Sequence, residues 1–304
     1  MTQALTRRIV TNSDLDAIVS AVLLKRIEPV GAVKYLPKEE LRNNRFQGTL
    51  EDIVVNMPFV KGCRLWFDHH DSNDVPSSFE GRYDPDAPSA ARVIWDYYAE
   101  RDNENAFQGL EHLLKETDRV DSADFTPEDI KQPGGVVLVS FLIDSHPLEK
   151  VTASENDLMI SLLDSGDPND VLNHPVFEPR ARKFLDELEE SKQAQKKALH
   201  EQDGLVTIDF RSLGDREKEL CNNKFLPFVI YPDSHTLLRI KRLNDKKVKL
   251  NLGYNMFKSG TPPVHYGNLL KQFEGGGHQK AAGCAVPNNQ VEKAVETIRE
   301  AVLK

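Results

Sequence analysis

The sequence is poor in cysteine and has no long hydrophobic segment. Its three cysteines, Cys63, Cys221 and Cys284, are widely spaced and form no CxxC pair, so neither a disulfide framework nor a zinc knuckle is expected. The longest apolar stretch, residues 134–143, is far shorter than the roughly 20 residues that cross a bilayer. The first 14 residues carry charges where a signal peptide needs an apolar core. We therefore expect a cytoplasmic protein with no membrane partner.

The chain also lacks an overall excess of basic residues. Its 304 residues include 39 Lys and Arg against 48 Asp and Glu, which gives a net charge of −9. A protein that coats duplex DNA needs a basic surface, so this class is excluded. The charge is unevenly distributed, because residues 204–304 hold 16 basic and 10 acidic residues while residues 1–203 are net negative. Opposite net charges in two parts of the chain indicate two domains.

The first half of the chain alternates short β-branched segments with helical patterns. Strands are expected at residues 8–11, 32–36, 52–56 and 63–67, and helices at 15–26, after Pro88-Ser89, along 107–114 and from Thr126. Such alternation predicts an α/β domain built on a mainly parallel sheet.

A polar helix over residues 178–202 is expected to connect this domain to a smaller one. In the smaller domain, strands are expected at 205–210, 226–231, 236–242 and 247–252, and helices at 264–273 and 290–303. The predicted organisation is a parallel-sheet domain over residues 1–177, a connector over 178–203 and a mixed-sheet α/β domain over 204–304.

Two aspartates follow the first predicted strand and begin the first helix. Asp14 and Asp16 would lie at the carboxyl edge of the sheet, where parallel α/β proteins bind ligands. Carboxylates two residues apart can supply oxygen ligands to one or two divalent cations. An aspartate that only caps the helix, beside a solvated neighbour, is the alternative.

Asp68, His69 and His70 follow another apolar strand. Adjacent histidines cannot point the same way, so one would bind a metal while the other meets substrate. Imidazole beside carboxylates favours Mn²⁺, Fe²⁺ or Zn²⁺ over Mg²⁺. A polar turn with incidental histidines is the alternative.

Three further aspartates, Asp118, Asp121 and Asp124, lie at the end of a predicted helix. Carboxylates there oppose the helix dipole, and a bound cation would offset this cost. Solvated loop residues are the alternative.

A glycine run, Gly275-Gly276-Gly277, is followed by His278 and a segment of small residues. Such a run lets backbone N–H groups approach an anion, and we expect a helix N-terminus behind it. A tight turn with no ligand is the alternative.

Together and in this order, these motifs resemble the DHH phosphoesterase superfamily with its C-terminal DHHA1 domain. Within it, the chain is most similar to the exopolyphosphatase-like and oligoribonuclease/pAp-phosphatase group. The resemblance covers essentially the whole chain and implies a two-Mn²⁺ site in a cleft between the domains, with Mg²⁺ or another divalent ion as the alternative. It also implies nucleic-acid or phosphate binding by the glycine loop, and it allows a homodimer.

The resemblance assigns a role to each matching position. Metal ligands are implied at Asp14, Asp16, His69 and either Asp118 or Asp121. The catalytic positions are His70, which would contact the scissile phosphate, and Asp68. Substrate-binding positions are Gly276, Gly277 and His278.

Two positions depart from the family pattern. Asn12 stands where the family has His or Asp, and Asn56 stands where it has an aspartate that bridges both metals. Two divalent ions about 3.5–4 Å apart repel strongly without a bridging anion. We therefore expect one bound ion rather than two.

The expected function is metal-dependent hydrolysis of a short phosphorylated substrate: an oligonucleotide, which would be single-stranded, a nucleotide bisphosphate or polyphosphate. The positive charge of residues 204–304 favours such an anionic partner, and stacking on Tyr254 or Phe257 would favour nucleotides. Asn12 and Asn56 support the alternative, a degenerate DHH protein that binds phosphate or nucleotide without turnover.

Overall fold

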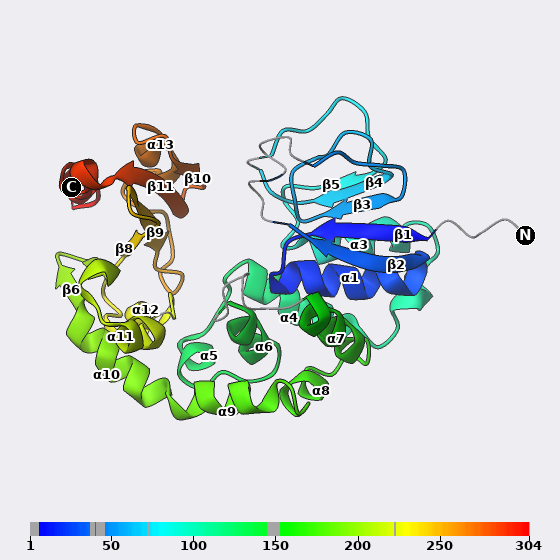
Figure 1. The fold of residues 1–304 in the computed structure, drawn as a ribbon, viewed down its shortest axis with the longest axis horizontal. Coiled ribbons are helices and arrows are strands. Elements are labelled where there is room, and N and C mark those ends of the chain that lie inside the picture. The colour runs from blue at the N-terminus through cyan, green and yellow to red at the C-terminus, as the bar shows by residue number, and fades with distance from the viewer. Residues whose placement is uncertain are drawn as a thin grey trace, which may run out of the picture. The chain divides into compact units, whose positions relative to one another are not determined.

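The chain forms two compact units (Figure 1). The computed structural model describes residues 6–36, 40, 46–71, 73–144, 153–221 and 223–303. The first unit comprises Met1–Asp124 and Gly134–Arg182, and the second comprises Phe125–Pro133 and Lys183–Lys304. Each unit has its own sheet and its own hydrophobic core, as two domains of this size require.

Five strands of the described part of the first unit form the predicted parallel sheet, in the order β2-β1-β3-β4-β5. Their bounds are β1 Arg7–Thr11, β2 Val30–Tyr35, β3 Asp52–Val55, β4 Leu65–Asp68 and β5 Gly81–Tyr83. The four predicted strands are confirmed to within two residues at each end. The fifth, β5, was not predicted because three residues carry too little pattern.

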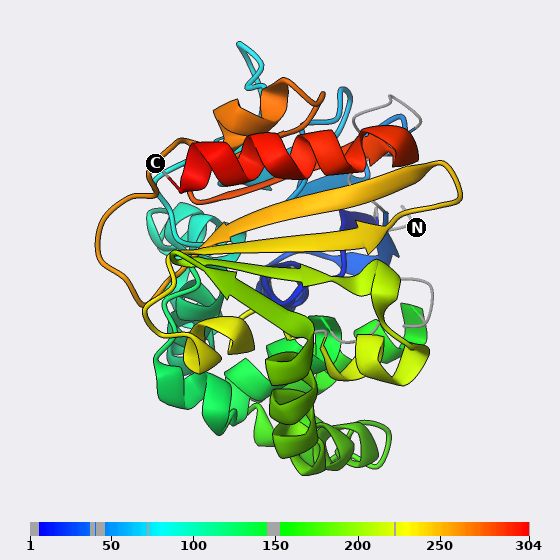
Figure 2. The same cartoon turned by 90° about the vertical axis from the view of Figure 1, so that its left-hand side faces the viewer.

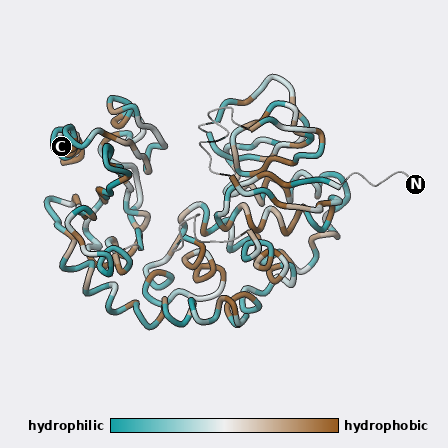
Figure 3. Tube along the Cα trace, viewed as in Figure 1, coloured by the Kyte–Doolittle hydropathy of each residue, from teal (hydrophilic) through white to brown (hydrophobic). Residues whose placement is uncertain are grey.

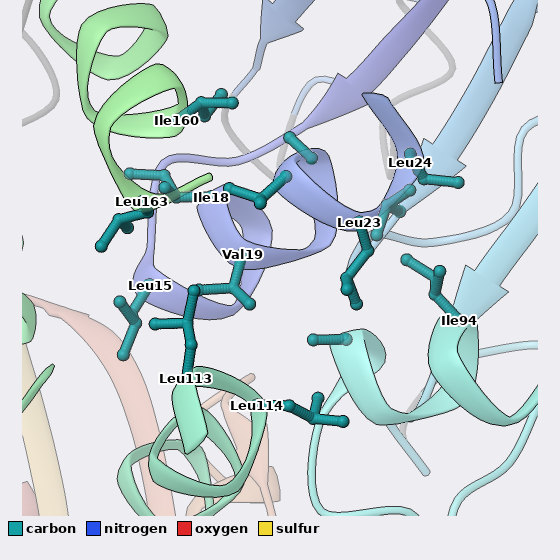
Figure 4. Packing of buried hydrophobic residues seen from close by; sticks show 14 of the residues in the cluster. Leu15, Ile18, Val19, Leu23, Leu24, Ile94, Leu113, Leu114, Ile160 and Leu163 are labelled. Carbon is teal, nitrogen blue, oxygen red and sulfur yellow. The ribbon is translucent and has the colours of Figure 1, made fainter. Parts of the chain in front are cut away.

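Helix α1 lies at the centre of the first core. Ten successive residues, Leu15 to Leu24, are buried, as expected for a helix contacted on every side. Figure 4 shows its side chains meeting Ile94 of α3, Leu113 and Leu114 of α4, and Ile160 and Leu163 of α7. The helices of this unit are α1 Leu15–Ile27, α3 Ala90–Ala99, α4 Glu111–Asp121, α6 Gly135–Asp144, α7 Ala153–Leu163 and α8 Asn169–Leu172; α9 Glu178–Asp186 continues into the second unit.

The opposite face of this sheet is covered, within the described ranges, by aromatic side chains. Trp66 is fully buried and stacks on Tyr83, with ring centroids 5.4 Å apart. Phe59 and Phe79 meet the same indole edge-on. Both sides of β3 and β4 are therefore buried, which fixes the strand ends that carry Asn56 and Asp68.

The second unit contains a mixed sheet of six strands in its described residues, in the order β10-β11-β9-β8-β7-β6. Only β7 and β8 pair in parallel; the remaining neighbours are antiparallel. Helix α14 lies along one face (Figure 2), where it packs with α13 on the strands. The bounds are β6 Leu199–Gln202, β7 Leu205–Asp209, β8 Thr236–Arg242, β9 Lys247–Tyr254, β10 Gly276–Gly277, β11 Ala281–Pro287, α5 Pro127–Lys131, α10 Leu188–Ala198, α11 Asp215–Leu220, α12 Leu226–Ile230, α13 Tyr266–Lys271 and α14 Val291–Val302.

Two predicted elements of this region are wrong. The single helix predicted over 178–202 is instead two helices, α9 and α10, followed by strand β6. The strand forms because Asp203 and Gly204 both adopt positive φ and turn the chain into a β6–β7 hairpin. The strand predicted over 226–231 is helix α12, whose Pro227 lies in the first turn, where a missing N–H costs nothing. Figure 3 shows the hydrophilic character of α9 and α10 that suggested a connector, in contrast to the hydrophobic α6.

The longest apolar stretch of the sequence forms helix α6. None of the described helices combines the length and the hydropathy needed for a membrane span.

Gly81 of β5 provides a test of how the sheet edge is built. Its φ is +114°, and an added Cβ would lie 2.1 Å from the carbonyl oxygen of Trp66. The substitution Gly81→Ala should lower the free energy of unfolding by about 3 kcal/mol. Gly109 is the matched control, because its φ is +87° but an added Cβ meets nothing within 4 Å.

The Gly109→Ala variant should therefore lose only about 1 kcal/mol, the cost of the left-handed backbone alone. Urea denaturation of both variants measures the difference. Equal losses would contradict the close approach of β5 to β4.

Candidate active site

Polar side chains gather at the carboxyl edge of the parallel sheet. Strand β1 has β2 on one side and β3 on the other, so the chain reverses its direction of winding between β1 and β3. Ligands of open α/β sheets bind at such a point. Asn12 follows β1, Asn56 follows β3, and Asp68 ends β4 before His69. The edge thus brings together three segments that are far apart in the sequence.

Asp16 is almost completely buried, with 1% of its surface exposed. Its two carboxylate oxygens accept hydrogen bonds from the N–H groups of Ala90 and Ala91, at 2.9 and 2.8 Å, where helix α3 begins. Burial raises the pKa of Asp16 well above its usual value, and the charge of Asp121 raises it further. A cation beside this carboxylate would offset the cost of burying its charge.

His69 faces Asp16 and Asp121 through one ring nitrogen. Its Nε2 lies 3.2 Å from Oδ2 of Asp121 and 3.8 Å from Oδ2 of Asp16, but it has no aligned hydrogen-bond partner among the described residues. Its Nδ1 lies 3.1 Å from the carbonyl oxygen of Ala87. Because a carbonyl only accepts, Nδ1 carries a proton, and Nε2 is the ring nitrogen that faces the two carboxylates.

Asp16, His69 and Asp121 therefore form a group that fits a divalent metal ion. One ligand atom from each lies within 4.8 Å of the others. Two carboxylates and an imidazole suit Mn²⁺ and its neighbours in the first transition row. Without a metal, burial lowers the pKa of His69, but Asp121 and Asp16 outweigh this and raise it to about 9. In the metal-free protein, the protonated imidazole of His69 therefore provides the positive charge that faces Asp16 and Asp121.

Asp14 has different partners. Its Oδ2 accepts a hydrogen bond from Nδ2 of Asn12 at 2.7 Å, and its Oδ1 accepts from Nδ2 of Asn56 at 2.8 Å and from the N–H of Ala17 at 2.9 Å. Asp14 is thus the N-cap of α1 and is also held by both asparagines. Asn56 is 1% exposed, and its backbone adopts φ +54°. The structure does not place Asp14 in the group formed by Asp16, His69 and Asp121.

Asp118 and Asp121 lie one turn apart on α4 but have different surroundings. Asp118 accepts hydrogen bonds from Oγ of Ser89 at 2.7 Å and from Nε and Nη2 of Arg92 at 3.0 and 2.6 Å. Its oxygens are therefore committed to the start of α3. Asp121 is the one that approaches His69.

His70 points to another acid. Its Nδ1 lies 2.8 Å from Oδ1 of Asp68, which is completely buried, and Oδ2 of Asp68 accepts from Nδ2 of Asn73 at 2.6 Å. The hydroxyl of Tyr83 donates to the carbonyl oxygen of His70 at 3.2 Å. Adjacent His69 and His70 thus point in different directions and face different acids, with ring centroids 4.7 Å apart.

The glycine run lies in the second unit and forms a hairpin rather than the start of a helix. Gly276 and Gly277 form β10, which pairs with β11. A helix N-terminus does lie against the loop, that of α13, but its first N–H groups donate to the carbonyl oxygens of His278 and Gln279 rather than pointing to an anion. An added Cβ at Gly277 would lie 2.5 Å from the oxygen of Ala281, whereas one at Gly276 would meet nothing within 4 Å. Close packing therefore requires a glycine at position 277, whereas a side chain at position 276 would meet no neighbouring atom.

Sequence reasoning missed the residues that hold the site in place. These are Ser89 and Arg92, which bind Asp118, and Asn73 and Tyr83, which support Asp68 and His70. Pro88-Ser89 was recognised only as a helix start, although the N-terminus of a helix is where a buried carboxylate finds N–H partners.

Comparison with solved structures shows that this two-unit α/β fold occurs in a known phosphodiesterase. The similar structure is the pGpG-specific phosphodiesterase PggH from Vibrio cholerae, with a TM-score of 0.77 and 24% sequence identity. The similarity covers 98% of this chain and 99% of that chain. The expected two-part α/β fold is thereby confirmed.

Two other structures align over most of the chain but with low scores. An uncharacterized protein from Helicobacter pylori G27 has 15% identity and a TM-score of 0.27, covering 98% of this chain and 99% of that chain. CDC45 from Entamoeba histolytica has 8% identity and a TM-score of 0.43, covering 98% of this chain and 95% of that chain. Neither score supports a conclusion. No protein-family model and no curated protein sequence matches the chain.

The surroundings of His69 predict its titration. In the metal-free protein its imidazole should titrate near pH 9 rather than 6.5, and Asp121→Asn should lower the midpoint by removing a carboxylate that raises it. A metal binds the neutral ring, so protons compete with it at pH values below the midpoint. In that range the affinity for Mn²⁺ should increase about tenfold for each unit by which the pH is raised.

Histidine ring NMR in the presence of a chelator measures the midpoint, and the His69→Gln variant identifies the signal. A midpoint near 6.5 in the unmodified protein would contradict the described arrangement of the two carboxylates.

Proposed function

We propose that this protein is a metal-dependent phosphodiesterase that hydrolyses short oligonucleotides of about the length of pGpG. The observation that carries the proposal is the group Asp16, His69 and Asp121, which presents two carboxylates and one ring nitrogen to one point. The fold shared with a pGpG-specific phosphodiesterase supports an oligonucleotide over polyphosphate or a nucleotide bisphosphate.

Asp16, His69 and Asp121 would hold the metal ion, with Mn²⁺ favoured by the donor set. A bound divalent ion would supply the positive charge that stabilises the phosphoryl oxygens during hydrolysis. The protein contributes fixed ligand positions, because the N–H groups of Ala90 and Ala91 hold Asp16 and the carbonyl of Ala87 orients His69.

His70 would act on the scissile phosphate. Since Asp68 accepts from Nδ1, the proton of that nitrogen is held in place and Nε2 becomes the atom that can exchange a proton or donate to a phosphate oxygen. Asp68 is then a positioning residue, itself held by Asn73. Gly276, Gly277 and His278 are proposed to contact the substrate through the second unit.

The hydrogen bonds to Asp14 support a single metal ion. A second ion beside Asp14 would have to displace the amide groups of Asn12 and Asn56, which already donate to its two oxygens. The amides are neutral, so they satisfy the carboxylate without offering an anionic ligand. One ion per chain accounts for both asparagines.

Removal of a proposed ligand should abolish hydrolysis. With Mn²⁺ and pGpG, Asp121→Asn should lower kcat/KM by at least about 100-fold. Asp124→Asn removes an exposed carboxylate from the loop just after α4 and should change kcat/KM by less than about twofold. Product release can be followed by chromatography, with pAp, longer ribonucleotides and polyphosphate as comparison substrates.

Turnover that survives Asp121→Asn would overturn the assignment of the metal site. Failure of the unmodified protein to hydrolyse any of these substrates, with nucleotide binding retained, would favour the non-catalytic alternative.

Restoring a carboxylate should increase the metal content. After incubation with Mn²⁺ and removal of free ions, elemental analysis should find about one ion per chain in the unmodified protein and nearer two in Asn56→Asp. The matched control is Asn56→Ala, which removes the same amide without adding charge and should leave one ion. Two ions in the unmodified protein would contradict the role given to the asparagines.

A further inference from the structure

The three proposed metal ligands come from three different elements of the first unit. Asp16 lies in the first turn of α1, His69 follows β4, and Asp121 is the last residue of α4. One ligand atom of each lies within 4.8 Å of the others, so the two carboxylates repel each other unless a cation lies between them. The residues around the ligands must therefore hold this spacing.

A single short segment, residues 87–92, contacts all three elements that carry these ligands. It leads from the turn after β5 into the first turn of α3, and we call it the α3 entry. The carbonyl oxygen of Ala87 lies 3.1 Å from Nδ1 of His69. Two backbone N–H groups at the helical end of the segment donate to the two carboxylate oxygens of Asp16, at 2.9 and 2.8 Å. Two of the three ligands are thus held by its backbone.

The contact with the third element is made through Asp118. Its Oδ1 accepts a hydrogen bond from Oγ of Ser89 at 2.7 Å, and its Oδ2 accepts from Nε and Nη2 of Arg92 at 3.0 and 2.6 Å. Ser89 is completely buried and is also the N-cap of α3, because its Oγ accepts from the N–H of Arg92 at 2.9 Å. Asp118 therefore ties α4 to the α3 entry, one turn before Asp121 on the same helix.

These contacts suit Asp118 to fixing a position rather than to binding an ion. Both of its oxygens accept from another helix, and the planar guanidinium of Arg92 donates twice, which restricts the carboxylate more than a single bond would. The positive charge of Arg92 also offsets the unfavourable place of a carboxylate near the C-terminal end of α4.

We propose that Asp118 is a positioning residue of the metal site. Through it, the α3 entry sets the place of Asp121 relative to the other two ligands, so that all three keep the spacing that a divalent ion needs. Removing a residue that orients a metal ligand in this way lowers metal affinity by about 10- to 100-fold. The proposal rests on the metal site of the proposed function but not on its substrate.

Binding of Mn²⁺ to the full-length protein tests this role without any substrate. Asp118→Asn keeps all three ligands, and its Kd for Mn²⁺, measured by isothermal titration calorimetry, should rise at least about tenfold. Arg92→Met should raise Kd as well, and the double variant should bind about as weakly as Asp118→Asn, because the two residues act as one unit. Thermal unfolding confirms that each variant is folded at the temperature of the titration.

Glu116→Gln is the matched control. The side chain of Glu116 lies on the same helix as Asp118 and is nearly as buried, with 18% exposed against 15%. It pairs with Arg119 at 2.6 Å, but this ion pair lies within α4 and does not join two helices. Its loss should change the Kd for Mn²⁺ by less than about twofold.

The outcomes separate the positioning role from the proposed activity. Weaker Mn²⁺ binding by Asp118→Asn, with no hydrolysis by any form, would support the role and refute the phosphodiesterase. If the unmodified protein hydrolyses pGpG, excess Mn²⁺ should restore activity to Asp118→Asn but not to Asp121→Asn, which lacks a ligand. An unchanged Kd in Asp118→Asn, an equal loss in Glu116→Gln, activity that excess Mn²⁺ fails to restore, or no Mn²⁺ binding by the unmodified protein would overturn the proposal.

Discussion

The buried carboxylate of Asp16 is the constraint on which the candidate site depends. A charge with 1% exposure is costly, and the protein meets that cost from two directions. The N-terminus of α3 donates two N–H groups, and His69 approaches from the end of β4. Asp121 of α4 adds a second negative charge to the group and increases the cost. Because these elements all pack on α1, the same core that buries Asp16 also sets the spacing of the proposed metal ligands.

The distribution of charge differs between the two units. At the sheet edge of the first unit, the carboxylates of Asp16 and Asp121 lie close together, so a bound cation would offset their repulsion. In the second unit, Lys241 lies directly opposite Lys249 in the β8–β9 pair. The neutral amides of Asn12 and Asn56 donate hydrogen bonds to Asp14. The group that could hold a cation is therefore formed by Asp16, His69 and Asp121.

Much of this arrangement could be predicted from sequence where the signal is local. Strand ends followed by Asp, His or Asn placed the site at one sheet edge, and Thr126 was correctly recognised as a helix cap. Asp118 and Asp121 could not be distinguished from sequence, because both lie on one side of α4 and their different partners, Arg92 of another helix and His69, are distant in sequence. Residues 226–230 form a helix despite the β-branched Val229 and Ile230, with Pro227 in the first turn. The hairpin signal of Asp203-Gly204 was overlooked.

The central claim is that one metal ion is held by Asp16, His69 and Asp121 while amides satisfy Asp14. Anomalous diffraction at the manganese edge, from crystals grown with Mn²⁺, tests it most directly. The account predicts one peak within coordinating distance of those three residues, with Asn12 and Asn56 still hydrogen-bonded to Asp14. Two peaks, one of them ligated by Asp14, or a single peak away from His69, would contradict it.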